Sequence, residues 1–289
     1  MPTSVKLLNI TRNLEPDYLE GFRNSEGILP KVTTPEEIIT FIARVSNPKG
    51  QEKQTAQSAL SLLRYLYIEG HVSPPEMVNM TVEVQCSRAV SAQLLRHVSL
   101  KKQEFSQRYA DPDTIAVTDL LTDLIDDFEP RLQDKKNRQN STAIEDSFLA
   151  SKAKDIAEAA FSLVVGSYKS LLALGIAKEV ARGLLPMDSP TRIILQGNIR
   201  DWFFYLAIRN KEGTQKEHRE VAAGIEAIFK KEMPAIWTCL QEFRYFEAMK
   251  RDLWKMIDKD GDIVEFEVVA KKKDGSMKTI SFPLPDELT

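Results

Sequence analysis

The chain has 289 residues, of which 43% are hydrophobic and 28% charged, and its formal net charge is -3. This composition is typical of a globular protein with a sizeable core, and the weakly acidic charge excludes a broad attraction to nucleic acid or to acidic membranes. Two cysteines are too few for a disulfide framework or a thiolate zinc site, and the three histidines show no metal-ligand spacing, so we expect no metal.

The N-terminal segment lacks the apolar core of a secretory signal, and no run of about 18 apolar residues could cross a bilayer. We therefore expect a cytoplasmic protein. A short strand is predicted over 4–12. A helix is predicted from Pro35, with Thr34 as its N-cap, and an amphipathic helix over 58–69 is stopped by Gly70.

Alternating apolar residues predict a half-buried strand over 80–86. The 3.6-residue period then predicts helices over 145–174, 177–185, 191–209, 214–231 and 235–256. The longest of them would face the core with Ile156, Ala160, Leu163, Val164, Tyr168, Leu171 and Leu172. In the tail, Asp274-Gly275 between two β-rich runs predicts a hairpin.

The segment from Gln93 to Tyr109 concentrates amide, cationic, carboxylate and hydroxyl groups within a short stretch. On a helix, Gln93, Arg96 and His97 would share one face. Ser106 and Arg108 would point the same way if their segment is extended. A guanidinium with a nearby hydroxyl and amide can cradle a phosphate, so this segment predicts an anion site.

Arg96-His97-Val98, then seven residues and Ser106, resembles the signature of flavin-dependent thymidylate synthases, in which Arg-His-Arg precedes the Ser. Val98 departs from the third Arg, and we expect weaker flavin binding as a result. Further segments resemble the family over about residues 35–245: Ala43-Arg44-Val45-Ser46, Gly70 to Glu76, Glu179 to Pro186, Asn198-Ile199-Arg200 and Gln215-Lys216-Glu217.

The resemblance implies a set of site residues. Those expected to contact deoxyuridine monophosphate (dUMP) are Gln93, Arg96, Glu104, Ser106, Gln107, Arg108, Arg182 and Arg209. Those expected to contact FAD are Ser46, Ser73, Glu76, Arg96, His97, Val98, Gln103, Glu104, Asn198, Arg200 and Phe204. Phe204 stands where some members place an Asn, and a phenyl ring cannot make that hydrogen bond. His71 is placed to stack on folate.

Arg209 is implied as the catalytic residue, because a fixed cation beside the uracil ring stabilises its anionic form. By itself, an Arg at a helix C-terminus more commonly meets the helix dipole. Asn198 and Arg209 would project from the same face of the helix over 191–209. Neither Cys86 nor Cys239 has a neighbour that would activate a thiol, so we expect no cysteine nucleophile.

The implied fold is α+β, with a mixed sheet packed by long helices, in a homotetramer whose sites are shared between subunits. We expect a catalytic domain over 1–256 and a hairpin extension over 257–289 that packs on it. The implied reaction is reductive methylation of dUMP to dTMP, with 5,10-methylenetetrahydrofolate as carbon donor and FAD reduced by NADPH or NADH. No membrane or nucleic-acid partner is expected.

Two alternatives stay open. The same scaffold and substrates could release 5-hydroxymethyl-dUMP, or the scaffold could serve as a non-catalytic nucleotide- or RNA-binding protein. The basic segment from Arg131 to Ser141 is interpreted either as a solvated loop or as a holder of the folate tail or the nicotinamide phosphates.

Overall fold

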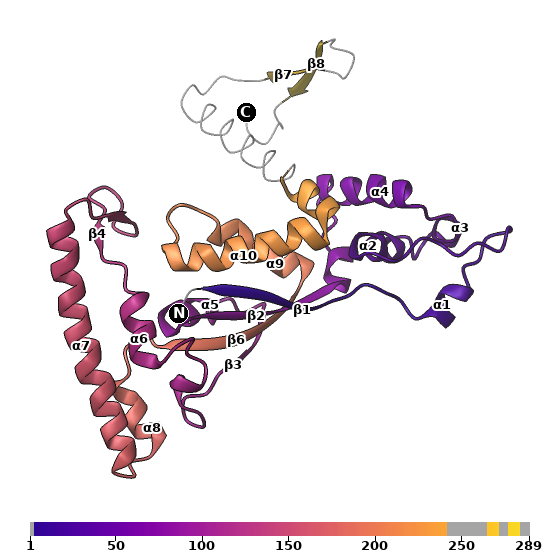
Figure 1. Cartoon of the computed structure of the whole chain (residues 1–289). Helices are drawn as coiled ribbons and strands as arrows, with labels where there is room; N and C mark the ends of the chain where they lie inside the picture. The colour runs from indigo at the N-terminus through magenta and orange to yellow at the C-terminus, as the bar shows by residue number, and fades with distance from the viewer. Residues whose placement is uncertain (1–2, 242–264, 272–276, 284–289) are drawn as a thin grey trace. The chain divides into compact units, whose positions relative to one another are not determined.

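A computed structural model of the chain describes residues 3–241, 265–271 and 277–283 (Figure 1). The chain divides into two compact units, Met1–Trp237 and Thr238–Thr289. The first unit combines a sheet with helices, so the predicted α+β class is confirmed. The domain boundary predicted after residue 256 falls outside the described residues and stays a prediction.

The first unit is built on a four-stranded sheet with the strand order β1-β2-β6-β3. Its strands are β1 (Ser4–Ile10), β2 (Asn79–Ser87), β6 (Pro190–Asn198) and β3 (Lys101–Glu104). Each pair in this sheet is antiparallel, so the predicted mixed sheet is wrong for the part of the chain described. β2 precedes the segment from Gln93 to Tyr109 and β3 lies within it. Because β6 pairs with both strands, they are held by one common neighbour.

β6 and α9 (Ile199–Arg209) replace the single helix that we predicted over 191–209. Buried residues along β6 alternate with more exposed ones, which is the two-residue period of a strand. The helix begins only after Asn198, whose side chain accepts the N–H of Asp201 in a capping box. Asn198 and Arg209 therefore do not share a helix face, and that prediction is wrong.

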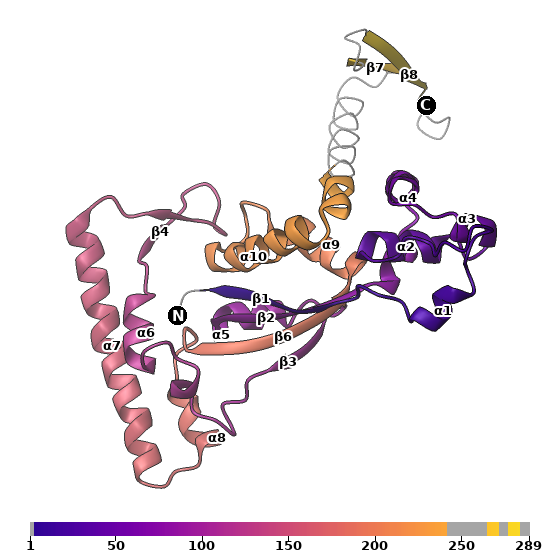
Figure 2. The same ribbon diagram turned by 45° about the vertical axis from the view of Figure 1, so that its right-hand side comes forward.

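Helices α9 and α10 (Lys216–Glu232) lie over one face of the sheet (Figures 1 and 2). Trp202 on α9 is fully buried, and its indole N–H donates to the Met80 carbonyl on β2 at 3.1 Å. The inward stripe of α10 is made of His218, Val221, Ala222, Ile225 and Phe229. The predicted helix over 214–231 is thus confirmed, with its start at Lys216.

The N-terminal part folds into four helices and a 3-10 turn: α1 (Pro16–Glu20), α2 (Pro35–Ala43), α3 (Pro48–Glu52), α4 (Ala56–Ile68) and η1 (Pro74–Met77). The predicted N-cap is confirmed, because Thr34 and Glu37 form a capping box. Gly70 follows α4 with a φ of 69°, a conformation that glycine adopts without strain. This turn gives the loop that carries His71 its direction.

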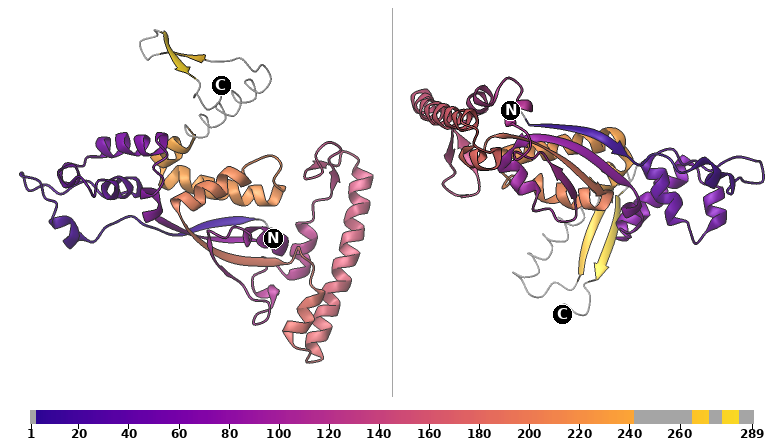
Figure 3. Two further views of the ribbon diagram at one scale, coloured as in Figure 1. Left: turned by 180° about the vertical axis from the view of Figure 1, so that it is seen from behind. Right: turned by 90° about the horizontal axis from the view of Figure 1, so that it is seen from below.

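A second layer of contacts joins α6 (Leu120–Asp126) to α7 (Ser147–Ala173). Seen from behind, α6 runs beside α7 and the short α8 (Lys178–Ala181) lies near one end of it (Figure 3). The 3-10 turns η2 (Pro112–Thr114) and η3 (Arg182–Leu184) complete this region. The contact is apolar and buries Leu120, Leu124 and Val165.

The core stripe predicted for α7 is largely wrong. Of its seven residues, only Tyr168 is buried, whereas Ile156 is 65% and Leu163 is 72% exposed in the single chain. Among the described helices, α7 alone has the length and apolar composition of a membrane span, a test that core helices of soluble proteins also pass. The apolar face of α7 is therefore not covered by the described part of the single chain.

Two hairpins complete the described chain. β4 (Arg131–Gln133) pairs with β5 (Ser141–Ala143), so the basic segment, which is expected to be a loop, begins with one strand of a hairpin and ends at the start of the other. In the tail β7 (Glu265–Lys271) pairs with β8 (Met277–Pro283), which confirms the predicted hairpin. The Asp274-Gly275 turn, and the helix predicted over 235–256 beyond residue 241, lie outside the described residues.

Candidate active site

Residues 88–100 link β2 to β3 and begin with α5 (Arg88–Leu94), which Ser87 caps by accepting the N–H of Val90. The α-helix ends at Leu94, before Arg96 and His97, so the helix face that we predicted is not formed as such. The two residues follow in turns whose N–H groups still donate to the carbonyls of Gln93 at 3.3 Å and Leu94 at 3.1 Å. Gln93 and His97 both lie beside His218 on α10, with Gln93 Oε1 3.1 Å from His218 Nδ1 and the two imidazole centroids 6.2 Å apart.

His97 meets Arg209 at the end of α9, and this pair is the centre of the candidate site. The Arg209 Nε donates to His97 Nε2 at 2.8 Å, so the imidazole accepts and is neutral. The His97 ring also lies edge-on to the Tyr205 ring, with centroids 4.9 Å apart. Burial first, then the positive charges of Arg209, Lys102 and Arg96, lower the pKa of His97 to about 4.

Positive charge is concentrated here without a matching carboxylate. In the part of the chain that the structure describes, neither Arg96 nor Arg209 has a salt bridge. Burial is the main cause that lowers the pKa of Arg209; Tyr205 acts in the opposite direction, and the nearby Arg96 lowers the pKa again. Two guanidinium groups that repel each other and face no anion are suited to hold one, such as a phosphate or an ionised ring.

Behind this pair lies a buried polar group that the sequence analysis missed. His218 on α10 is fully buried, with its Nδ1 3.1 Å from Gln93 Oε1 and its Nε2 3.1 Å from the Tyr205 hydroxyl. Gln93 Nε2 donates in turn to Gln215 Oε1 at 2.6 Å. The period of α10 could have revealed His218, because it occupies an inward position of an otherwise apolar stripe.

Glu104, at the end of β3, accepts from three donors through its Oε1. Arg88 Nη1 and Ser91 Oγ lie 2.6 Å away and Thr191 Oγ1 lies 3.1 Å away. The same carboxylate, after burial as the larger cause, raises the pKa of Cys86 to about 12. Cys86 is therefore no nucleophile at neutral pH, while Glu104 keeps its other oxygen for a ligand. The preceding Gln103 is exposed.

Ser106 to Arg108 is a turn and not the extended segment that we considered. The Arg108 N–H donates to the Ser106 hydroxyl at 3.4 Å. The Arg108 guanidinium pairs with Glu179 on α8 at 3.2 Å, three residues before Arg182. Within the described residues, no hydrogen bond or ion pair joins this group to Arg96 or Arg209. Gln107 is buried, and its Nε2 has no partner among the described residues.

A second group of predicted site residues lies between η1 and α9. Arg200 on α9 pairs with Glu76 on η1, and its guanidinium lies over the Phe204 ring at 5.7 Å. Phe204 is half exposed and stands where some family members have an Asn. It makes a cation–π contact with Arg200 instead of a hydrogen bond. Asn198 Oδ1 accepts the Asp201 N–H at the N-cap of α9, so the side-chain N–H groups of Asn198 are left for a ligand.

The remaining predicted residues lie on exposed turns. Ser73 precedes η1, and Ser46 lies in the turn between α2 and α3. The His71 ring is exposed and packs only loosely on Tyr65, with centroids 5.8 Å apart. Val98 is 87% exposed. Among the predicted residues, Arg96, His97 and Arg209 form one group: Arg209 donates to His97, and the charge of Arg96 acts on both.

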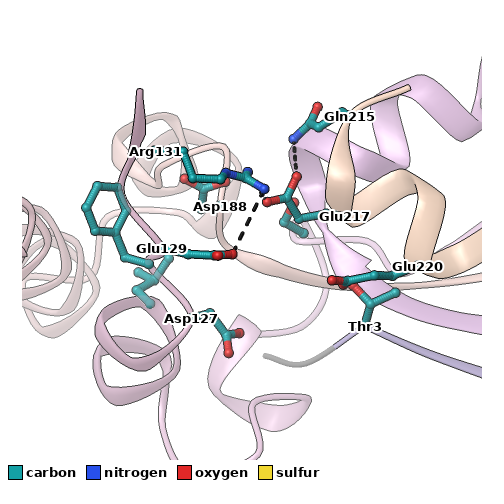
Figure 4. Close-up of a pocket in the computed structure, with 11 residues that line it drawn as sticks. Thr3, Asp127, Glu129, Arg131, Asp188, Gln215, Glu217 and Glu220 are labelled. Carbon is teal, nitrogen blue, oxygen red and sulfur yellow. Dashed lines mark hydrogen bonds and ion pairs between the residues drawn. The ribbon is translucent and has the colours of Figure 1, made fainter. Parts of the chain in front are cut away.

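A cavity of about 360 Å³ opens beside α6 and α10 (Figure 4). Its lining carries five carboxylates: Asp127, Glu129, Asp188, Glu217 and Glu220. Arg131 pairs there with Glu217 and lies 4.0 Å from Glu129, while burial, and then Glu217, raise the pKa of Asp188. Arg131 pairs here with a protein carboxylate, although its buried Nη1 has no hydrogen-bond partner among the described residues. A role of this segment in holding folate or nicotinamide anions therefore stays a prediction.

The donors present fit a flavin and an anionic nucleotide. Gln107 Nε2 is a buried donor without a partner among the described residues, and Arg96 and Arg209 lack salt bridges in that part of the chain. A buried donor such as Gln107 Nε2 is costly unless a ligand supplies an acceptor. Arg96 is exposed and Arg209 half-buried, so these two groups are accessible to an anion. No group of three or more metal-ligating side chains is found among the described residues.

Comparison with known proteins agrees with this chemistry. The family model described as "Thymidylate synthase complementing protein" matches residues 28–235. A protein of Paramecium bursaria Chlorella virus 1, named probable flavin-dependent thymidylate synthase, is 38% identical over 237 residues, which cover 81% of this chain and 96% of the viral protein. The flavin-dependent thymidylate synthase of Synechocystis is 39% identical over 211 residues, covering 72% of this chain and 90% of that protein.

A solved structure of similar fold is the UMP/dUMP methylase of Streptomyces cacaoi with 5-Br dUMP, at a TM-score of 0.62 and 22% identity, covering 83% of this chain and 95% of that one. At this identity the likeness supports the fold alone. The two sequence matches also establish the family, because their identities of 38% and 39% extend over most of each protein. The chain therefore belongs to the thymidylate synthase complementing protein family, which is the family of the flavin-dependent thymidylate synthases.

Proposed function

We propose that this protein methylates dUMP to dTMP by reductive methylation, with 5,10-methylenetetrahydrofolate as carbon donor and NADPH or NADH as the source of electrons. Family membership supports the reaction, and one observation in the chain carries the assignment of the site. That observation is the Arg96–His97–Arg209 group, which gathers two guanidinium groups and a neutral imidazole without a carboxylate partner among the described residues.

In this proposal, Arg209 is the catalytic residue and acts by electrostatics. Attack from carbon 5 of uracil requires electron density to be pushed into the ring, and a fixed cation beside the ring stabilises the resulting anion. His97 keeps Arg209 in place, because its Nε2 accepts the Arg209 Nε hydrogen. With its low pKa, His97 adds no competing positive charge at neutral pH. No enzyme nucleophile is required, which fits the raised pKa of Cys86.

The other nucleotide contacts divide between two places. Gln93 and Arg96 lie with Arg209, whereas Ser106, Arg108 and Arg182 lie around α8. Glu104 ends β3 just before the turn of Ser106 and Arg108, and Gln107 lies in that same turn. We propose that the two places come together across subunits of a homotetramer. The exposed apolar stripe of α7 supports such an assembly, because a stripe of this kind is usually covered by a partner.

FAD would supply the hydride when bound. The residues proposed to hold it are Ser46, Ser73, Glu76, Arg96, His97, Val98, Gln103, Glu104, Asn198, Arg200 and Phe204. Arg200 and Phe204 already pair through a cation–π contact, so Phe204 offers a flat apolar surface in place of a hydrogen bond. Val98 offers only its backbone. His71, exposed on its loop, is proposed to stack on the folate ring.

The proposal is tested with the full chain, purified in yellow form or loaded with FAD. We expect the visible flavin spectrum to bleach on addition of NADPH or NADH with dUMP, and to recover when 5,10-methylenetetrahydrofolate is added, with dTMP as the product by mass spectrometry. Release of 5-hydroxymethyl-dUMP would instead establish the hydroxymethylase. A colourless protein that takes up no FAD would overturn the proposal in favour of a non-catalytic nucleotide- or RNA-binding role. We also propose a cytoplasmic location, which fractionation of the source cells would test.

A further inference from the structure

A continuous series of hydrogen bonds runs from the acidic cavity to the buried face of the candidate site. Glu217 Oε2 accepts from Gln215 Nε2 at 2.8 Å, and Gln215 Oε1 accepts from Gln93 Nε2 at 2.6 Å. Gln93 Oε1 lies 3.1 Å from His218 Nδ1, and His218 Nε2 lies 3.1 Å from the Tyr205 hydroxyl. Figure 4 shows the first of these contacts at the edge of the cavity, where Gln215 points its amide at Glu217.

The direction of every bond in this series follows from its carboxylate end. Glu217 pairs with Arg131 through its other oxygen, so it is ionised and can only accept. Gln215 must then turn its NH₂ group toward Glu217 and its carbonyl toward Gln93. Since a carbonyl only accepts, Gln93 must turn its NH₂ group toward Gln215 and its own carbonyl toward His218.

The same reasoning continues through the imidazole. A carbonyl facing His218 Nδ1 requires a hydrogen on Nδ1. His218 is fully buried, and burial, with the charge of Arg209 and the nearby His97, lowers its pKa to about 3. A neutral imidazole with a hydrogen on Nδ1 has a bare Nε2, so Nε2 accepts the hydroxyl hydrogen of Tyr205. Only one arrangement of hydrogens satisfies all four contacts.

We propose that Glu217 and His218 are positioning residues that fix the orientation of the Gln93 amide, so that Gln93 offers dUMP its second N–H hydrogen. This inference rests on the proposed function, because it assigns a role to a residue of the same site. The carbonyl of Gln93 is occupied by His218 and one N–H by Gln215, so the group left for a ligand is a donor. The nucleotide atom it meets must be an acceptor, such as a carbonyl or phosphate oxygen.

The first test reads the imidazole hydrogens directly. Nitrogen-15 NMR of the FAD-loaded full chain, labelled at histidine, distinguishes a protonated nitrogen from a bare one, and the His218 signal is identified by its loss in His218→Gln. The chain has three histidines, so the spectrum is simple to assign. We expect His218 with a hydrogen on Nδ1 and none on Nε2 at pH 7.5. The opposite tautomer, or a doubly protonated ring, would overturn the proposal.

The second test removes the Glu217 carboxylate, which sets the direction of the hydrogen bonds in the series. Glu217→Gln can present either a carbonyl or an NH₂ group to Gln215, so the amide of Gln93 is no longer held in one orientation. We expect the dUMP dissociation constant, measured by calorimetry on FAD-loaded protein, to rise about fivefold to tenfold, the worth of one hydrogen bond. The matched control is Glu220→Gln, the same substitution on the same helix and in the same cavity but outside the series. Here we expect a change below about twofold.

The outcomes separate this inference from the proposed function. If dUMP does not bind to the wild-type protein at all, the proposed function fails, while the tautomer of His218 still decides the hydrogen-bond direction. If dUMP binds equally well to wild type and Glu217→Gln, the positioning role is wrong although the function stands. If Glu217→Gln does not fold, the tautomer measured in the wild-type protein decides alone.

Discussion

His97 lies where positive charge from three side chains meets a partly buried imidazole. Its pKa of about 4 results first from burial and then from Arg209, Lys102 and Arg96. A cation beside an imidazole disfavours the protonated form, so each of these charges lowers the pKa. Of these three cations, Arg209 also donates a hydrogen bond to His97. Substitution of Arg209 therefore tests the electrostatic effect on His97 most directly.

We predict that Arg209→Gln raises the pKa of His97 toward the ordinary value of about 6.5. The substitution removes a charge and the Nε donor together, while a glutamine still fits at the end of α9. NMR titration of the His97 ring between about pH 3.5 and about pH 8 would measure this pKa, because the range includes both about 4 and about 6.5. As a control, Arg219→Gln on α10 removes a guanidinium that contacts the Glu212 carbonyl and should leave the His97 pKa in place. An unchanged pKa in Arg209→Gln would contradict the electrostatic account.

The same shift links pH to stability. In the unfolded chain a histidine binds a proton near pH 6.5, whereas folded His97 does so only near pH 4. Between these values the unfolded state binds more protons, so stability falls as the pH falls from about 6.5 toward 4. We predict that the urea midpoint decreases over this range and that the decrease is smaller in His97→Gln. An equally steep decrease in the variant would assign the acid sensitivity to other groups.

At the scale of elements, two glycines in the middle of helices meet very different surroundings. A Cβ on Gly224, in α10, would lie 2.7 Å from Cγ2 and 2.9 Å from Cβ of Val5 on β1, whereas a Cβ on Gly166, in α7, would meet nothing within 4 Å. Glycine costs helix stability relative to alanine wherever the alanine side chain fits. The two positions therefore separate intrinsic helix propensity from helix-to-sheet packing.

We predict that Gly166→Ala raises the free energy of unfolding by about 0.5–1 kcal/mol, and that Gly224→Ala lowers it by about 1–3 kcal/mol because β1 must shift. Urea denaturation at pH 7.5 would measure both. In the double variant Gly224→Ala with Val5→Ala, part of the loss should be recovered, because the atoms in the way have been removed. Stabilisation by Gly224→Ala alone would show that α10 and β1 are not packed as closely as described here.

The elements that the sequence predicted well are those whose signals are local. The capping box at Thr34 and Glu37 marks the start of α2, and alternation marks β2. β6 was predicted as a helix because Thr191 to Asn198 runs without a break into the apolar residues of α9, and only the capping box at Asn198 marks the change. Period alone does not distinguish a short buried strand from a helix.

The site residues stay predictions that rest on the family resemblance, and the contacts among them could not be predicted from the sequence. The family resemblance implied Arg96, His97 and Arg209, yet no local pattern could reveal that Arg209 donates to His97, because the two are joined only through the fold. Nor could it reveal His218 as the partner of Gln93, since the inward direction of His218 depends on how α10 packs on the sheet. Pairings between distant segments are set by tertiary packing.

At the scale of the whole molecule, α7 presents an apolar stripe that the single chain does not cover. Leu149, Ile156 and Leu163 follow at seven-residue spacing and are 42%, 65% and 72% exposed. The opposite side of the helix packs on α6 through Val165. A continuous row of exposed aliphatic side chains at this spacing is typical of a helix that packs against another helix. In the proposed homotetramer, a second copy of the chain would cover it.

We predict that Ile156→Glu combined with Leu163→Glu dissociates the assembly, because two buried carboxylates without partners would each cost far more than a surface contact contributes. Sedimentation velocity of the full chain should show a tetramer for the wild type and smaller species for the variant. Ser151→Glu adds an acid to the same helix on another, exposed side and should leave the tetramer intact. Because Arg108 and Arg182 would meet Arg209 only across subunits, the dissociated variant should also lose dUMP binding while it keeps its helical circular dichroism. A wild-type monomer that binds dUMP with full affinity would contradict both the shared site and the role of this stripe.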